Sequence, residues 1–579
     1  MIFSQGIDEY IFTIGMLVSF FGTVISLIML RNEIADAFRK NGIKRVHLIF
    51  AFLIIVLFLS IELLVIKTTQ QLFFDDIIYQ GGAQMLLHTG QAWMCNYGSP
   101  TNCISGQIFH EPIATSFLLA IGFFFFGINR YIAFYEFIII SAIAIATFFA
   151  AALILFKKPI YALFSELLLA LSPLLLVWAA PTNSDIVMMF YSIIAFFALL
   201  LLIEKKNIWT WAFMLFSFSA LTYTKIDALM YLPIFFIAYI ALSKKPLIPT
   251  LKKYASHAKK FFNININLRY FTLVILFIIS ITPSLIYFST QYNNGYGFNN
   301  TQIANSCSKY NTQLHVTAAI DLANFNANIC SNILFWFNSY STMNGYPIMQ
   351  PLFFTILGIF GAALMFLKNR RELFVLGIWF IIIFLVYTSF YAGSVLYGVD
   401  WRFFLALIPL SALFGGFAAG RILDIKHIQK NKFFLYASSI IIIVLMLYST
   451  LSMYNELSIN PSHIIQANSA RFYENFVYNN SNKIPNDCLV FSFDPTLFNI
   501  NNKSSLQFSY LSGMNETVYN SYMNNNKCLV IDYGFWCYTP EGSSMCQSAL
   551  NEFNTTVLAS ATDNFTMQKF SIYQVNKFN

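Results

Sequence analysis

Charge is the scarcest property of this sequence. Only 10% of the 579 residues are Asp, Glu, Lys or Arg, whereas 58% are hydrophobic and 18% are aromatic. Soluble domains carry about 25% charged residues, so the composition excludes a soluble protein. The apolar runs are about 20 residues long, the length at which an α-helix crosses a bilayer. This length predicts a helical membrane protein and disfavours a β-barrel.

Other familiar signatures are missing as well. The sequence shows no heptads, no internal repeat and no glycine-rich phosphate loop. Residues 1–10 contain no Lys or Arg, which is poor for a secretory signal and makes the first apolar run a retained span. The net charge of +8 could suggest a nucleic-acid partner, but the basic residues lie in short connections between apolar runs. We therefore expect no nucleic-acid binding.

Twelve apolar runs predict transmembrane helices, and most Lys and Arg residues fall in every second connection between them. The positive-inside rule makes those connections cytoplasmic. Both termini and the loop after the second span are then expected outside. A further apolar stretch, 113–128, is expected to be an interfacial or re-entrant helix, because a crossing there would invert every later loop. The twelve runs are 11–30, 46–66, 131–156, 160–180, 186–203, 208–224, 226–243, 270–289, 350–367, 372–391, 402–420 and 432–452.

These runs predict three parts of the chain. Residues 1–45 form an extra N-terminal transmembrane helix with a cytoplasmic loop. Residues 46–452 form a transmembrane core with a first outer loop at 67–130. Residues 453–579 form an extracytoplasmic domain, for which β-prone runs at 488–493, 528–532 and 570–575, separated by polar turns, predict a small α/β or mostly β fold.

Cysteines occur only in the predicted outer segments, with an even number in each. This placement predicts disulfides in an oxidising space. A metal site is the alternative, but the spacings lack the tight CxxC form, so we expect no metal centre. The expected pairs are Cys95–Cys103, Cys307–Cys330 and, as the preferred one of three tail connectivities, Cys488–Cys528 with Cys537–Cys546.

Two adjacent carboxylates, Asp75 and Asp76, follow a very apolar segment. An ionised side chain at a membrane surface is costly and therefore a candidate functional group. The alternative is that one Asp caps the next helix, for which Asp is a favoured residue. Both interpretations can hold, with one Asp capping and the other reacting.

Several short segments, taken in order, resemble the GT-C glycosyltransferases that use polyprenyl-phosphate sugars. The resemblance is strongest to the branch of protein mannosyltransferases and aminoarabinose transferases, and it covers about residues 46–452. Glu111 stands where this family usually has Pro. The matching segments are the Asp75-Asp76 pair, His110-Glu111-Pro112-Ile113 with the run ending at Phe126-Gly127, Leu171-Ser172-Pro173 followed by Asp185, Leu221-Thr222-Tyr223-Thr224-Lys225, and Asp400-Trp401-Arg402-Phe403 with Pro409.

This resemblance implies an enzyme with its active site outside. We expect it in the plasma membrane, because no retention signal ends the sequence. It would move a sugar, such as the hexose mannose, from a polyprenyl- or dolichyl-phosphate donor to a glycan, lipid or protein acceptor. No cofactor or metal would be obligatory. Asp75 would be the general base, and Asp76 would orient the acceptor or cap the helix.

The same resemblance supplies candidates for binding the donor phosphate and the substrates. They are Lys225, Arg402, His110, Glu111, Asp185 and Arg130. Each has a structural alternative: a local ion pair for Lys225 and Arg402, a helix cap for Asp185, an interfacial anchor for Arg130, and a plain loop residue for His110 and Glu111.

Two other classes of function compete with the enzyme. Twelve spans also suit a transporter or lipid permease, but the sequence shows no related halves, and its ionisable residues gather at the outer ends of spans. A membrane scaffold or receptor with an outer binding domain would leave the charged groups around the first loop unexplained.

Overall fold

The computed structural model describes most of the helical body and the C-terminal domain. Some residues in the described elements, Asp75 among them, are described by backbone alone. The described residues are 7–66, 75–91, 94–100, 102–107, 113–243, 268–293, 325, 328–329, 332–333, 336, 350–389, 400–425, 428, 431–459, 472–511, 514, 516–526, 528–564 and 566–578.

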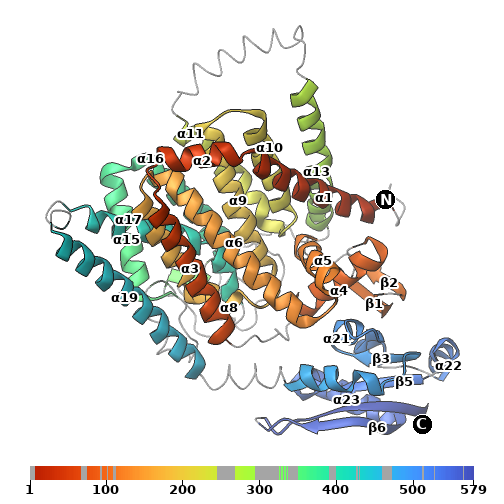
Figure 1. The fold of residues 1–579 in the computed structure, drawn as a ribbon. Coiled ribbons are helices and arrows are strands. Elements are labelled where there is room, and N and C mark those ends of the chain that lie inside the picture. The colour runs from red at the N-terminus through yellow and green to blue at the C-terminus, as the bar shows by residue number, and fades with distance from the viewer. Residues whose placement is uncertain are drawn as a thin grey trace.

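Apolar helices form the larger body of the molecule (Figure 1). Within the described residues, seven helices are long and apolar enough to cross a membrane. These helices are α1 (Ile7–Met29), α3 (Arg45–Leu64), α6 (Arg130–Phe156), α9 (Ser184–Glu204), α13 (Leu268–Asn293), α16 (Arg370–Ser389) and α19 (Lys432–Ile459).

Shorter helices fill the rest of this body, and each run predicted as a span contains at least one described helix. The shorter elements are α2 (Arg31–Lys40), α5 (Ala114–Phe126), α7 (Pro159–Ala170), α8 (Pro173–Trp178), α10 (Ile208–Thr222), the 3-10 helix η1 (Ile226–Met230), α11 (Tyr231–Leu242), α15 (Leu352–Lys368), the 3-10 helix η3 (Asp400–Ala406) and α17 (Ile408–Leu423). The predicted fold class, a polytopic helical membrane protein with a C-terminal sheet domain, is confirmed.

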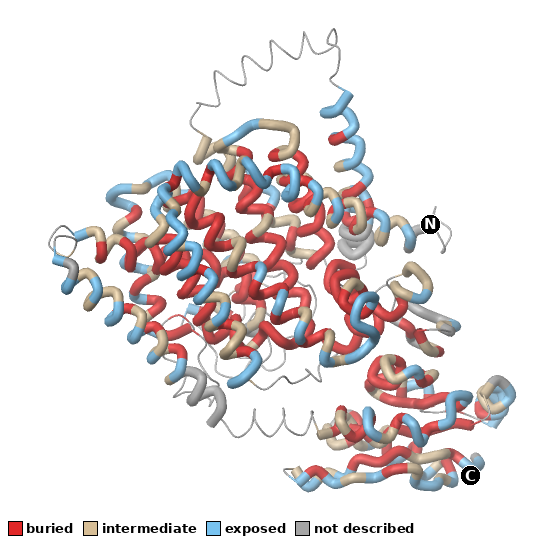
Figure 2. The backbone as a smooth tube through the Cα atoms, in the orientation of Figure 1, coloured by how far each residue is buried: buried red, intermediate tan, exposed pale blue. Residues whose placement is uncertain are grey.

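Helices α6 and α9 form the centre of the helical body. Their apolar windows are 78% and 89% buried, whereas those of α3 and α19 are only 17% buried. Figure 2 shows the same contrast between a buried centre and partly exposed outer helices. A helix that is hydrophobic all round belongs inside a helix bundle. The first turn of α9, which holds Asp185, is therefore a buried position.

The apolar stretch 113–128 contains a helix of 13 residues, α5. At 1.5 Å per residue it spans about 20 Å, which is short for a hydrocarbon core of about 30 Å. It is buried over most of its length and packs against α4 (Asp75–Thr89) and α6. The expectation that this helix does not cross stays a prediction, because α7, in a run predicted to cross, is shorter still.

A seven-stranded sheet forms the second body, in the order β2-β1-β4-β3-β5-β7-β6. Strands β3, β4 and β5 are parallel, and the other pairs are antiparallel. We call residues 472–578 the C-terminal domain. It contains a helix at 472–480, β3 (Cys488–Ser492), α21 (Pro495–Asn499), β4 (Ser504–Gln507), α22 (Glu516–Asn525), β5 (Cys528–Tyr533), α23 (Pro540–Glu552), β6 (Phe553–Thr562) and β7 (Lys569–Phe578).

The three β-prone runs of the sequence coincide with β3, β5 and β7. Strands β4 and β6 were not expected, and neither were β1 (Met94–Ser99) and β2 (Asn102–Gln107), which come from the loop after α4. Strand β1 joins the C-terminal domain by pairing Tyr97 with Leu506 and Gly98 with Ser505. Because two segments of one sheet share one side of a membrane, this loop and the C-terminal domain lie on the same side.

Three disulfides are present in the described residues, and they join the pairs expected from the sequence. Cys95–Cys103 links β1 to β2, Cys488–Cys528 links β3 to β5, and Cys537–Cys546 joins the segment after β5 to α23. The expected pair Cys307–Cys330 lies outside the described residues.

Two buried carboxyl groups face each other at the carboxyl ends of β3 and β5. Asp532 accepts hydrogen bonds from the Tyr473 hydroxyl and from Ser492 Oγ, the latter at 2.7 Å, and Asp494 accepts from Trp536 Nε1 at 3.2 Å. Burial, together with the charge of Asp532, raises the pKa of Asp494 to about 8. Burial also raises the pKa of Asp532 to about 6, although its two hydrogen bonds oppose this.

These raised pKa values predict a C-terminal domain that is more stable in mild acid. The folded domain retains protons that the unfolded chain releases above about pH 4, so stability falls as the pH rises from about 4 to about 8. We expect a loss on the order of 3 kcal/mol between pH 5 and pH 8. Hydrogen exchange of the β3 and β5 amides in the full chain, corrected for intrinsic exchange rates, measures this loss of stability.

The variant Asp494→Asn should remove the part of this dependence that lies between about pH 6 and pH 8, because its amide stays neutral, and should leave the smaller part due to Asp532. Asp487→Asn, at an exposed position of the same domain, is the matched control and should retain the slope of the wild type. A wild-type domain that is equally protected at pH 5 and pH 8 would contradict the assignment.

Candidate active site

Asp185 is the meeting point of two cations from distant parts of the chain. Its Oδ1 accepts a hydrogen bond from Lys225 Nζ at 2.8 Å, and its Oδ2 lies 3.4 Å from Arg402 Nε. The Asp185 side chain is fully buried, and the side chains of Lys225 and Arg402 are only 9% and 12% exposed. Lys225 and Arg402 thus share the Asp185 carboxylate in a region nearly closed to water.

Local structure explains how each member is presented. Asp185 lies in the first turn of α9, where the helix dipole favours an anion, and Asn183 caps that helix by accepting from Ile186 N at 2.9 Å. Lys225 is an extended residue between α10 and η1. Arg402 lies in η3, just before α17. All three side chains therefore come from helix ends, where the backbone turns and side chains can converge.

Aromatic rings complete the surroundings of the two cations. Lys225 Nζ lies 3.9 Å from the centroid of the Phe403 ring, and Arg402 lies 5.6 Å from that ring and 6.0 Å from Trp178. Tyr387 stacks on Phe403, with the two ring centroids 5.6 Å apart and the rings nearly parallel. Such contacts attract a cation to the ring face. Trp178 and Tyr387 could not be selected from the sequence, because nothing distinguishes them among so many aromatic residues.

The acidic pair lies at the start of α4, beside the helix that carries Asp185. Asp76 is fully buried, and its backbone carbonyl accepts a hydrogen bond from Thr182 Oγ1 at 3.1 Å. Thr182 stands three residues before Asp185. The side chain of Asp75, the first residue of α4, lies outside the described residues.

The start of α5 also reaches this region. Ala114 N donates to the carbonyl of Tyr223 at 2.9 Å, and Tyr223 stands two residues before Lys225. His110 and Glu111, which precede α5, lie outside the described residues. Of the residues selected from the sequence, Asp76, Asp185, Lys225 and Arg402 are thus in neighbouring segments.

Arg130 is engaged elsewhere. Its guanidinium donates to Glu474 Oε1 at 2.9 Å and to Asn475 Oδ1 at 2.6 Å, both in the C-terminal domain. The guanidinium also lies 4.8 Å from the centroid of the Tyr478 ring. Arg130 was selected as a substrate-binding candidate or an interfacial anchor, and the structure gives it contacts that join the two bodies. No sequence signal marks Glu474 as its partner.

Comparison with known proteins relates this arrangement to known folds. Residues 110–265 match the family model of the dolichyl-phosphate-mannose-protein mannosyltransferases. That segment contains Asp185 and Lys225. No curated protein sequence matches the chain.

Solved structures are similar over most of the chain. ArnT from Cupriavidus metallidurans bound to undecaprenyl phosphate has a TM-score of 0.52 and 11% identity, covering 90% of this chain and 97% of that chain. The structure of its apo state has a TM-score of 0.51 and 12% identity, with the same coverage of both chains. The oligosaccharyltransferase of Archaeoglobus fulgidus in complex with Zn and sulfate has a TM-score of 0.49 and 13% identity, covering 90% of this chain and 72% of that chain. At these identities the ArnT likeness is one of fold, and residues 110–265 in addition resemble the dolichyl-phosphate-mannose-protein mannosyltransferase family.

Proposed function

We propose that this protein transfers a sugar from a lipid-phosphate-linked donor to an acceptor on the extracytoplasmic side of the plasma membrane. One observation carries the proposal: Lys225 and Arg402 converge on Asp185 in a buried region beside the start of α4. Cations placed there can stabilise the phosphate that leaves the sugar, and electrostatic stabilisation of this kind is strong where water is excluded.

Asp185 holds the two cations in place before the donor arrives. A donor phosphate would take over part of this role, because Arg presents a planar fork that suits phosphate oxygens and Lys presents a compact charge. Neither cation would then have to reorient during the reaction. Asp185 therefore acts as a positioning residue for Lys225 and Arg402.

The acidic pair supplies the base. As a bond forms between the acceptor oxygen and C1 of the sugar, the bond from C1 to the phosphate oxygen breaks, and the acceptor proton passes to a carboxylate. Asp75 is the proposed base, and Asp76, buried beside Thr182, holds the start of the helix in place.

The comparisons support a polyprenyl- or dolichyl-type donor, because the matched family is described by dolichyl-phosphate-mannose and the ArnT structure contains undecaprenyl phosphate. We propose a hexose such as mannose as the sugar, and a glycan, lipid or protein hydroxyl as the acceptor. The lipid-linked sugar is the only cosubstrate in this proposal, since two cationic side chains can offset its phosphate charge.

Replacing the base tests the reaction directly. Asp75→Asn should lower transfer by about 100-fold or more, because an amide cannot accept the acceptor proton. The intact mass of the acceptor, measured with and without the lipid-linked donor, reports the transfer. Asp36→Asn, at an exposed position on α2, is the control and should retain activity. Wild-type turnover by a folded Asp75→Asn protein would contradict the assignment.

Removing either cation tests the phosphate site. Lys225→Gln and Arg402→Gln should each lower kcat/KM for the donor by about 100-fold, the usual effect of losing one donor to a developing anion. Lys205→Gln, at an exposed ion pair with Asp36, serves as the control. Steady-state rates are normalised to the folded fraction obtained by size exclusion. Values of kcat/KM near that of the wild type in both variants would rule out this role.

A further inference from the structure

Two helices connect the candidate active site to the C-terminal domain. Figure 1 shows α4 and α5 between the helical body and the sheet. Both begin at the site, α4 beside Thr182 and α5 beside Tyr223. They pack against each other, so a shift of one is transmitted to the other.

The far half of α4 rests on the C-terminal domain. Gln84 Nε2 donates to the carbonyl of Ile500 at 3.3 Å, and a Cβ added to Gly81 would lie 3.5 Å from Thr496. The strand that follows α4 is also held, because Asn499 Nδ2 donates to the carbonyl of Cys95 at 3.2 Å. These contacts fix the end of α4 to a domain that begins nearly 400 residues later in the sequence.

A polar stripe runs along α4 between the two ends. Asp76, Gln80 and Gln84 are spaced by four residues and therefore share one face of the helix. All three are buried, with exposures of 0%, 1% and 1%. Polar side chains this deeply buried fix a helix by specific hydrogen bonds, so rotation or sliding of α4 would break them.

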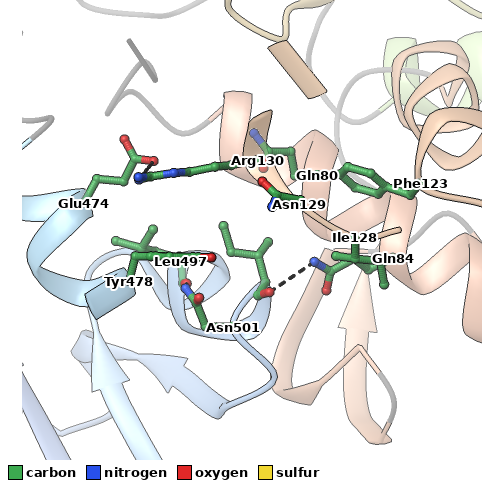
Figure 3. Close-up of a pocket in the computed structure, with 11 residues that line it drawn as sticks. Gln80, Gln84, Phe123, Ile128, Asn129, Arg130, Glu474, Tyr478, Leu497 and Asn501 are labelled. Carbon is green, nitrogen blue, oxygen red and sulfur yellow. Dashed lines mark hydrogen bonds and ion pairs between the residues drawn. The ribbon is translucent and has the colours of Figure 1, made fainter. Parts of the chain in front are cut away.

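Arg130 attaches the end of α5 to the C-terminal domain through an ion pair with Glu474. It is the first residue of α6, just after α5, and Figure 3 shows its side chain pointing across the junction toward Glu474. The ion pair is 2.9 Å long, with side chains only 11% and 5% exposed. A buried pair of this kind is strongly coupled, because removal of one partner leaves the other charge unpaired.

The junction combines apolar packing with a cavity. Ile77, in the first turn of α4, belongs to the same buried cluster as Tyr473 and Phe476 of the C-terminal domain. A cavity of about 40 Å³ lies between the two bodies, lined by Gln80, Gln84, Arg130, Glu474 and others. It has room for one or more waters. Gln84 Oε1, which lines it, is buried without a hydrogen-bond partner among the described residues. A polar, partly open interface allows relative motion of two domains, so a few specific contacts must set their alignment.

We propose that the C-terminal domain positions the acidic pair at the start of α4, and that the Arg130–Glu474 ion pair is the fastening on which this alignment depends. The inference rests on the proposed function. Arg130 and Glu474 are positioning residues that act through α5 and α4. They do not touch the reacting groups.

Charge reversal tests the role of the Arg130–Glu474 ion pair. Arg130→Glu and Glu474→Arg should each lower kcat by about 10- to 100-fold, because a displacement of about 1 Å at reacting groups costs about 100-fold. The KM for the donor should stay unchanged, since Lys225 and Arg402 are untouched. The double variant re-forms the ion pair with opposite polarity but not the hydrogen bond to Asn475. It should therefore recover part of the lost kcat, as expected for directly coupled residues.

Hydrogen exchange gives a readout that does not depend on activity. In each single variant the amides at 76–82 of α4 should lose protection, and the double variant should regain it. Lys158→Glu is the matched control, because Lys158 forms an ion pair with Asp424 between α7 and α17, away from α4 and α5. It should change neither the kcat per folded molecule nor the exchange of α4.

The outcomes separate the two proposals. Folded single variants with wild-type kcat and α4 protection would overturn the positioning role, even if the wild type transfers sugar. Losses explained entirely by a smaller folded fraction would overturn it as well. The wild type could instead transfer no sugar, while α4 still loses exchange protection in the single variants and regains it in the double variant. In that case the proposed function has failed, but the ion pair still positions α4.

Discussion

The sharing of Asp185 by Lys225 and Arg402 is the interaction on which the arrangement of the helical body depends. Two cations placed close together away from water repel each other, and each has lost most of its hydration. The Asp185 carboxylate lowers the cost of this placement, because it pairs with both cations and lies at the start of α9, where the helix dipole favours an anion. The end of α10, the 3-10 helix η3 before α17 and the start of α9 are consequently held close together. A buried network of this kind is satisfied only when every member is present.

The second constraint is that the sheet is not made by the C-terminal domain alone. Strands β1 and β2 come from the loop after α4, and they extend the sheet through β4. Helix α4 therefore belongs to two bodies, because its start lies beside Thr182 while Ile77, Gly81 and Gln84 contact the C-terminal domain. The chain thus builds the candidate active site at the boundary between a rigid helical body and a domain that could otherwise move. This construction explains why a helix of only 15 residues carries so many buried polar side chains.

Features with a strong local pattern could be predicted from the sequence. The apolar runs gave the helices, and the β-branched and aromatic runs gave β3, β5 and β7. Asp185, Lys225 and Arg402 could be selected because charge is rare in the apolar part of the chain. Their joint geometry could not be predicted, since an ion pair between distant segments leaves no trace in local periodicity. The same holds for Arg130 and Glu474. Strands β1 and β2 were missed because short segments with Gly, Ser and Asn have low β-propensity, and only pairing with β4 stabilises them.

The buried triad also bears on selectivity in the proposed reaction. A ligand that enters must compensate two cations at least as well as Asp185 does, and a neutral headgroup would only add to the cost of desolvating them. A phosphate can do so, because it brings negative charge and several acceptor oxygens. The ion pairs that hold the helix ends together would thus favour a phosphate over a neutral headgroup, and no further residue is needed for this selection. In the proposed reaction the sugar and the acceptor would then be distinguished near the start of α4, which packs on the C-terminal domain.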